Sequence, residues 1–381
     1  MPNELIVMAV GDVTVGTREL PGEPACLQTQ IWEEGADPYR WLEQVAPVLK
    51  HGDFTIGNLM GTICDIASPA ESKSSTGGGN ISMPPKVADV LKRAGFHAFS
   101  VANNHTMDFG PEGMLQTLTN LKRVGLGASG GGRNIQEARK PVILEQDGVK
   151  LALLSYSSVF MPGSSPAGEN KPGMATVSVN TSYQIPGNIF YNPGVPPRII
   201  TTPNREDVEK MLEDVREAKA QADLVVVNWH WGSSKWANSI ASGLPIKDSL
   251  CYVLNYQEDM GRAAIDSGAD LVVGHQPHRL QGVEIYKGKF IFYSLGVFTF
   301  PFSMGMNFGE ESCIVKGYID SKAKRLTRVH LLPVLVPMNT MQPHVVPVAE
   351  AARVITELER LSQKYKTKFT TKCGEIVIEA A

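Results

Sequence analysis

Short apolar segments alternate with longer segments of helical periodicity along most of the 381-residue chain. The apolar segments are rich in Val, Ile and Leu and have no polar side, which is typical of strands buried on both faces of a sheet. We expect such strands at 5–10, 54–58, 96–102, 149–155, 224–229, 271–274 and 290–294. Helices are expected at 38–50, 85–94, 111–124, 205–221 and 257–267. This alternation predicts a layered α/β fold with helices on both sides of the sheet structure.

A long segment at about 158–204 breaks the pattern, because it is dense in Pro, Gly and Asn. Loops of this length inside a domain usually serve binding, so we interpret it as a substrate-facing lid, with an inert insertion as the alternative. The end of the chain predicts a helix at 348–366 and an edge strand at 375–379. We therefore expect one large domain over 1–335 and a C-terminal part, 336–381, that packs on it.

Composition excludes several classes of protein. The 36 Lys and Arg residues nearly balance 39 Asp and Glu residues, and the net charge of −3 predicts no nucleic-acid partner. Five scattered cysteines without a CxxC pair fit a reducing compartment. No apolar stretch has the length of a membrane span or the flanks of a signal peptide. We expect a soluble cytoplasmic protein without a membrane partner, and the oligomeric state stays open.

Five of the expected strands end on polar residues. These ends read Val10-Gly-Asp12, Ile56-Gly-Asn58, Val101-Ala-Asn-Asn-His105, Val227-Asn-Trp-His230 and Val273-Gly-His-Gln-Pro-His278. Because such strand ends meet at one rim of an open α/β sheet, we expect these side chains to converge there. Carboxylate, amide and imidazole groups together suit a divalent ion such as Mn²⁺, Zn²⁺ or Fe²⁺. Taken singly, each residue could instead cap a turn or lie in the core.

The order of these motifs resembles the CapA family, which is named for capsule poly-γ-glutamate synthesis proteins. The resemblance rests on Gly11-Asp12, Ala102-Asn-Asn-His-Thr-Met-Asp-Phe-Gly110, His230-Trp-Gly232, Gly274-His-Gln-Pro-His278 and Tyr293-Ser-Leu-Gly-Val-Phe298, and it spans about residues 4–300. The family's fold is similar to that of calcineurin-like metallophosphoesterases. The resemblance therefore implies a four-layer sandwich with a metal site at the carboxyl ends of the strands.

The resemblance also implies roles for individual residues. The metal ligands would be Asp12, Asn104, His230, His275 and His278. His105 would be the catalytic acid or base, and Asp108 would orient it. The candidates for substrate binding are Asn58, Asn103, Arg279 and Tyr191.

Three positions depart from the family pattern. The superfamily's Asp-x-His reads Asp12-Val-Thr14, the family's Asn-Leu-Glu reads Asn58-Leu-Met60, and its Ser-Leu-Gly-Asn-Phe reads Ser294-Leu-Gly-Val-Phe298. Met60 matters most, because two neighbouring divalent ions would lack a shared anionic ligand to offset their repulsion. We therefore expect one bound ion rather than two.

Four functions remain open on the sequence. We favour a metal-dependent hydrolase that cleaves a γ-glutamyl or peptide-like amide in a small or peptide-like acid, using metal-activated water and His105. A metal-dependent epimerase or isomerase of a peptide or amino-acid derivative is the second hypothesis. A phosphoesterase is the third, and a non-catalytic capsule-assembly or ligand-binding protein is the fourth.

Overall fold

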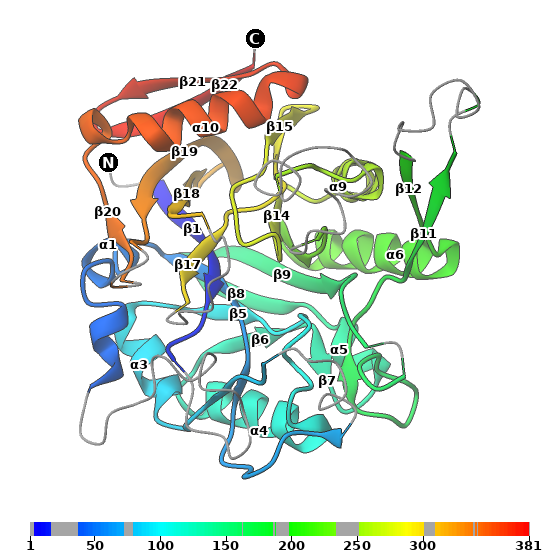
Figure 1. Cartoon of the computed structure of the whole chain (residues 1–381). Coiled ribbons are helices and arrows are strands. Elements are labelled where there is room, and N and C mark those ends of the chain that lie inside the picture. The colour runs from blue at the N-terminus through cyan, green and yellow to red at the C-terminus, as the bar shows by residue number, and fades with distance from the viewer. Residues whose placement is uncertain are drawn as a thin grey trace.

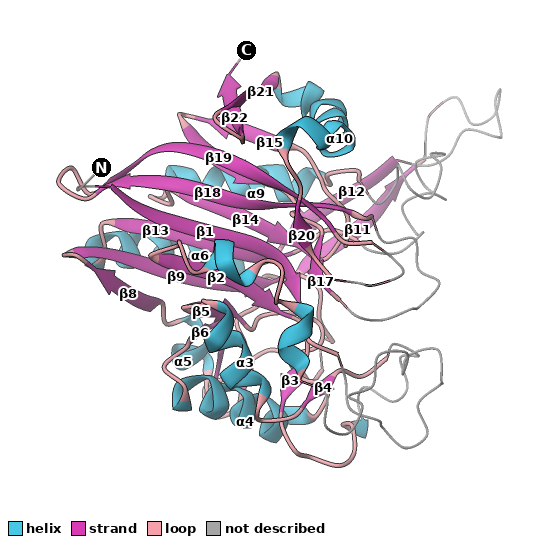
Figure 2. Ribbon diagram, turned by 90° about the vertical axis from the view of Figure 1, so that its left-hand side faces the viewer, coloured by secondary structure: helices cyan, strands magenta, loops and turns pink. Residues whose placement is uncertain are grey.

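Two β-sheets that face each other form the centre of the fold (Figure 1 and Figure 2). The computed structural model describes residues 4–16, 37–71, 79–161, 163–185, 187, 198–233, 251–300, 309–337, 340 and 342–380. Each sheet carries parallel strands whose carboxyl ends lie toward the same rim, and antiparallel strands extend both sheets.

The first sheet has ten strands. Its main path runs β21 (Thr367–Lys372), β22 (Glu375–Ala380), β19 (Arg325–Leu335), β18 (Glu311–Asp320), β1 (Glu4–Val13), β2 (Phe54–Leu59), β5 (Ala98–Ser100) and β6 (Gly127–Ser129). Two short strands pair beside this path, β17 (Val297–Thr299) with β1 and β20 (His344–Val345) with β19.

The second sheet has six strands in the order β15 (Val283–Tyr286), β16 (Lys289–Phe292), β14 (Leu271–His275), β13 (Leu224–His230), β9 (Val149–Ser157) and β8 (Val142–Gln146). Three small pairs complete the strands: β3 (Thr62–Ile63) with β4 (Ser82–Met83), β7 (Gly131–Gly132) with β10 (Gly173–Met174), and β11 (Val179–Gln184) with β12 (Arg198–Pro203).

Helices cover the outer face of each sheet. The first sheet packs against α1 (Ala46–Leu49), α3 (Val87–Ala94) and α4 (Gly110–Arg123), and the second packs against α6 (Arg205–Gln221) and α9 (Asn255–Asp266). A separate apolar cluster fills the space between the two sheets. The layers therefore run helix, sheet, sheet, helix, which confirms the predicted four-layer α/β sandwich.

The C-terminal part closes one end of the sandwich (Figure 1). Helix α10 (Ala352–Ser362) contributes Val354 and Leu358 to the cluster between the sheets, and β22 pairs with β19. At the opposite end lies α5 (Ile135–Arg139), near α4. Short 3₁₀ turns complete the helices: η2 (Pro38–Trp41), η3 (Val348–Glu350) and η4 (Gln363–Tyr365).

Several expected elements differ from the structure. The helix expected at 38–50 is split into η2 and α1, because Pro47 has no N–H to continue a helix across the turns at 42–45. The strand expected at the sheet edge, 375–379, lies inside the sheet, and β21 is the edge instead. The lid segment contains β10, β11 and β12 rather than loop alone.

Two further observations bear on the expectations from composition. In the described part of the chain, every helix is too short or too polar to cross a membrane. Four cysteines lie within the described residues, and each is a free thiol.

Candidate functional site

Strand register brings the predicted site residues to one rim. Asp12 of β1 lies directly beside Asn58 of β2, and His230 of β13 lies directly beside His275 of β14. Strand β5 ends at Ser100, which pairs with Asn58, and the turn after it carries Asn103, Asn104 and His105. Each sheet therefore delivers half of the polar groups to the same place.

Asp12 lies at the centre of these groups and is fully buried. Its Oδ1 accepts a hydrogen bond of 2.8 Å from the Asn58 amide, and its Oδ2 lies 2.8 Å from Nδ1 of His278. Nδ1 of His275 lies 3.4 Å from Oδ1. Burial alone would raise the pKa of the Asp12 carboxyl, but His275 and His278 outweigh it and hold that pKa well below its usual value. The carboxyl is therefore an anion at neutral pH.

His230 is the neutral partner in this cluster. Its Nε2 lies 3.0 Å from Oδ1 of Asn104, and its Nδ1 lies 3.3 Å from the amide nitrogen of Asn58. Complete burial lowers the pKa of His230 to about 3, although the charge of Asp12 acts in the opposite direction. An uncharged imidazole is the form that binds a metal ion.

The turn that carries His275 and His278 is strained. Gln276 has a φ of 98° and His278 a φ of 56°, both in the left-handed region that side chains disfavour. Each such residue costs of order 1–3 kcal/mol, and such strain persists where the surrounding structure fixes it. Pro277 lies between them, and its ring fixes the backbone at the middle of the turn.

His105 and Asp108 form a dyad beside this cluster. Nδ1 of His105 lies 2.8 Å from Oδ2 of Asp108, and the backbone N–H of Ile81 donates to the same oxygen at 2.8 Å. Asp108 is fully buried, whereas 14% of the His105 side chain is exposed. The backbone N–H of His105 donates to Asn103. Sequence reasoning missed the role of Ile81, because a backbone donor leaves no mark in residue type.

The residues predicted to bind substrate differ in their burial, and one of them is not described. Asn58 and Asn103 are fully buried, and their amides contact protein: Asn58 holds Asp12 and His230, and Asn103 donates to Asn58 and to the carbonyl of Leu59. Their contact with substrate stays a prediction, and the structure instead makes them positioning residues. Tyr191 lies outside the described residues.

Arg279 is half-buried at the rim, directly after His278. Its Nε is buried without a hydrogen-bond partner, and no carboxylate of the described residues forms an ion pair with it. An uncompensated guanidinium in such a position suits an anionic group of a ligand.

The three departures from the family pattern lie side by side. Met60 and Val297 belong to the apolar cluster under the first sheet, and the hydroxyl of Thr14 donates to the sulfur of Met83 in that cluster. The backbone N–H of Met60 donates to the carbonyl of Val13 at 2.8 Å. This side of Asp12 is therefore an apolar wall, and a glutamate at position 60 would have to turn away from that wall to reach an ion.

The donor chemistry of the cluster fits a divalent metal ion. Among the described residues, no three His, Cys, Asp or Glu side chains surround a common centre at ligand spacing, since Asp12 bonds directly to His278. The residue types nevertheless suit Zn²⁺, Mn²⁺ or Fe²⁺. Nε2 of His275 is buried without a hydrogen-bond partner, and a coordinate bond to a metal ion would satisfy it. Asp12, His275 and His278 are therefore the strongest candidate ligands.

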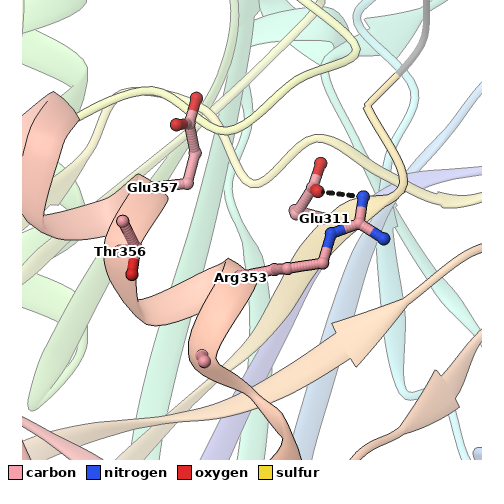
Figure 3. Close-up of a pocket in the computed structure, with 5 residues that line it drawn as sticks. Glu311, Arg353, Thr356 and Glu357 are labelled. Atoms are coloured by element: carbon pink, nitrogen blue, oxygen red, sulfur yellow. Dashed lines mark hydrogen bonds and ion pairs between the residues drawn. The ribbon is translucent and has the colours of Figure 1, made fainter.

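A cavity of about 450 Å³ lies away from these residues, between α10 and the start of β18 (Figure 3). Glu311, Ala352, Arg353, Thr356 and Glu357 line it, and Arg353 bonds to Glu311 at 2.5 Å. None of the predicted site residues contributes to it, and its own charges are paired.

Comparison with known proteins finds relatives that are named for capsule, PGA or polyglutamine synthesis. The chain is 28% identical over 327 residues to the capsule biosynthesis protein CapA of Bacillus anthracis, which covers 84% of this chain and 67% of that protein. It is 27% identical over 329 residues to the PGA biosynthesis protein CapA of Bacillus subtilis, covering 86% and 73%. A probable polyglutamine synthesis accessory protein of Mycobacterium tuberculosis is 26% identical over 204 residues, covering 52% and 44%.

Among solved structures, a phosphatase of Mycoplasma pneumoniae matches with a TM-score of 0.45 and 12% identity, covering 87% of this chain and 94% of that one. Residues 6–301 match the family described as bacterial capsule synthesis protein PGA_cap, in agreement with the resemblance found in the sequence at about 4–300. This match spans most of the chain and includes every described residue of the candidate site, so the chain belongs to the PGA_cap family of bacterial capsule synthesis proteins.

Proposed function

We propose that this protein is a metal-dependent hydrolase that cleaves a γ-glutamyl or peptide-like amide bond in a small or peptide-like acid. One observation carries the proposal: the partly exposed His105–Asp108 dyad adjoins a buried anionic Asp12 from the first sheet and three histidines from the second. The relatives named for capsule and poly-γ-glutamate synthesis support an acidic, amide-linked substrate.

Asp12, His275 and His278 would hold a single Mn²⁺, Zn²⁺ or Fe²⁺ ion, with Asn104 and His230 completing the set. Such an ion, when bound, makes water a nucleophile near neutral pH and polarises a carbonyl oxygen. Asn58 would keep Asp12 and His230 in place, because its amide contacts both. The apolar wall of Met60 and Val297 offers no anion that would bridge a second ion on that side of Asp12.

His105 would exchange a proton with the leaving amine. Asp108 accepts from Nδ1, so the proton moves at Nε2, the other ring nitrogen. Because Ile81 also donates to Asp108, the carboxylate stays fixed and the imidazole keeps one tautomer. Arg279 would bind a carboxylate of the substrate.

The test is metal analysis together with hydrolysis of a γ-glutamyl anilide by the purified chain soaked in Mn²⁺. We expect about one equivalent of metal, and His105→Ala should lower kcat by about 10²–10⁴-fold without changing metal content. His275→Ala should lower metal content without unfolding the chain. The exposed His51, changed to Ala, is the control that leaves both readouts unchanged.

Three results would overturn the proposal in different ways. Less than about 0.2 equivalent of metal after soaking would mean that no bound ion lowers the pKa of water. That result would favour a non-catalytic binding protein. Exchange of the substrate's Cα hydrogen without cleavage would favour the epimerase. Cleavage of a phosphodiester but of no amide would favour the phosphoesterase.

A further inference from the structure

A row of buried polar side chains lies between the two sheets, just below the candidate site. In the first sheet, register places Asn58 beside Ser100 and Ser100 beside Ser129. In the second sheet, Ser155 lies beside Asn228. The two halves meet at the residue after Ser129, since a Cβ placed on Gly130 would fall 2.9 Å from the Cβ of Ser155.

Strand alternation points these side chains into the space between the sheets. Leu224 and Val226 belong to the cluster between the sheets, so Asn228 and His230, at the same parity, face that space as well. Val225 and Val227 belong to the outer cluster under the helices. The same alternation applies to Ser155, which follows Leu151 and Leu153 of the inner cluster. The space therefore changes from apolar to polar one step before the rim.

Apart from Asn58, the side chains of this row have no hydrogen-bond partner among the described residues. Ser100, Ser129, Ser155 and Asn228 are each 0–2% exposed. The three hydroxyls and both amide atoms of Asn228 are buried and unpartnered. Buried polar groups of folded proteins are nearly always paired, because each unpaired one costs its desolvation. Five unpaired atoms in one place would remove a large part of a protein's net stability.

We propose that this row is a buried water-binding site. The amide of Asn228 offers both a donor and an acceptor, and each hydroxyl can act as either. A cation would satisfy the oxygens and leave the Asn228 N–H groups unpaired, and an anion would leave its carbonyl oxygen unpaired. Water serves both kinds of atom, because it donates and accepts hydrogen bonds. The inference is independent of the proposed hydrolysis.

Water in this row would add hydrogen bonds between the strands that carry the candidate site. Asn58, which pairs with Ser100, contacts Asp12, and His230, two residues after Asn228 on β13, contacts Asn104. Their neighbours Ser100 and Asn228 would be fixed through the same water molecules. The ligand-bearing ends of both sheets would then be linked by hydrogen bonds as well as by apolar packing.

The experiment is a crystal structure of the full chain at a resolution that shows ordered water, combined with the Tm of Asn228→Leu. We expect at least two water molecules in hydrogen-bond contact with Asn228 and the serines. The variant should lower Tm by several degrees, because the serine-bound water loses its main anchor. Gln146→Leu is the control: it removes an exposed amide of the same sheet, outside the row, and should leave Tm unchanged.

A dry row gives the opposite results. Density without water around Asn228, together with a Tm that rises in Asn228→Leu, would overturn the proposal, since removing unpaired polar atoms then stabilises the fold. Should Asn228→Leu fail to fold, Ser155→Ala replaces it with the same two readings. A fall in Tm supports the bound water and a rise contradicts it.

Discussion

At the scale of single residues, the same buried cluster keeps Asp12 charged and His230 neutral. Asp12 stays charged because histidines contact both of its oxygens, whereas His230 stays neutral because burial dominates. Asn58 touches both side chains and holds them at a fixed separation. A charged Asp12 carboxylate near the neutral imidazole of His230 is a state in which both groups can bind a cation without first releasing a proton.

Arg279 yields a prediction at this scale. Its guanidinium has no carboxylate partner among the described residues, so Arg279→Gln should raise KM for an anionic γ-glutamyl substrate by about 10-fold or more, with little change in kcat. The measurement is steady-state kinetics on two substrates, one with a free α-carboxylate and one with that group amidated.

The amidated substrate should show no such rise in KM, because it has no charge to lose. Arg133→Gln is the control, since Arg133 is exposed and pairs only with Glu137. Equal effects of Arg279→Gln on both substrates would show that Arg279 does not bind the carboxylate.

At the scale of secondary structure, glycines let strands approach closely where the site residues emerge. A Cβ on Gly274 would lie 2.1 Å from the carbonyl oxygen of Tyr293 and 2.3 Å from Nε1 of Trp231. A Cβ on Gly11 would lie 2.2 Å from the carbonyl oxygen of Gly296. The atoms that such a Cβ would meet belong to residues directly next to the ends of neighbouring strands.

Gly274→Ala should therefore separate β14 from the segment after β16. We expect the free energy of unfolding to fall by about 1–3 kcal/mol or more, as in overpacked cores, measured by urea denaturation. Gly163→Ala is the control, since no atom lies within 4 Å of its added Cβ. An unchanged midpoint for Gly274→Ala would mean that the strands part without cost.

Local signals explain which elements could be predicted. Helix α6 spans 205–221 as expected, with the Asn204 side chain accepting from the N–H of Asp207 at its start. Strands β18 and β19 were not predicted, although both are among the longest, because their sequences include Lys, Arg, Gly and Pro between the apolar residues. Their place beside β1 depends on contacts between residues far apart in the sequence.

The candidate site, too, has features that the sequence could predict and features that it could not. Spacing and residue type sufficed to predict that Asp12, Asn104 and the four histidines lie together. The positive φ of Gln276 and the second donor to Asp108 depend on tertiary packing, which no local pattern encodes. The buried position of Asn58 could not be predicted either, because an amide at a strand end looks the same in the sequence whether it faces solvent or a neighbouring carboxylate.

At the scale of the whole molecule, the site exists only when the two sheets are stacked. Asp12 and Asn58 come from one sheet, and His230 and His275 from the other. Helix α10 helps to hold the sheets together, because Leu358 lies in the cluster between them and is fully buried. Changes in global stability should therefore be visible at the site, and protonation of the site should be visible in global stability.

The protonation of His230 should make the stability of the whole molecule depend on pH. Its pKa is about 3 in the folded chain and near 6.5 when unfolded, so between these values the unfolded chain binds a proton that the folded chain does not. The free energy of unfolding should thus fall as pH decreases from 6.5, by up to about 1.4 kcal/mol per pH unit from this residue. Asp12 adds no slope there, since its carboxyl is ionised in both states above pH 3.8.

The measurement is urea unfolding between pH 7.5 and 5 with EDTA present, so that metal binding does not contribute. His230→Gln should have a shallower slope than the wild type, although not a flat one, because burial also lowers the pKa of His97. His51→Gln, at an exposed position, should keep the wild-type slope. Equal slopes for His230→Gln and the wild type would mean that His230 reaches solvent, and the enclosed cluster around Asp12 would then not form in solution.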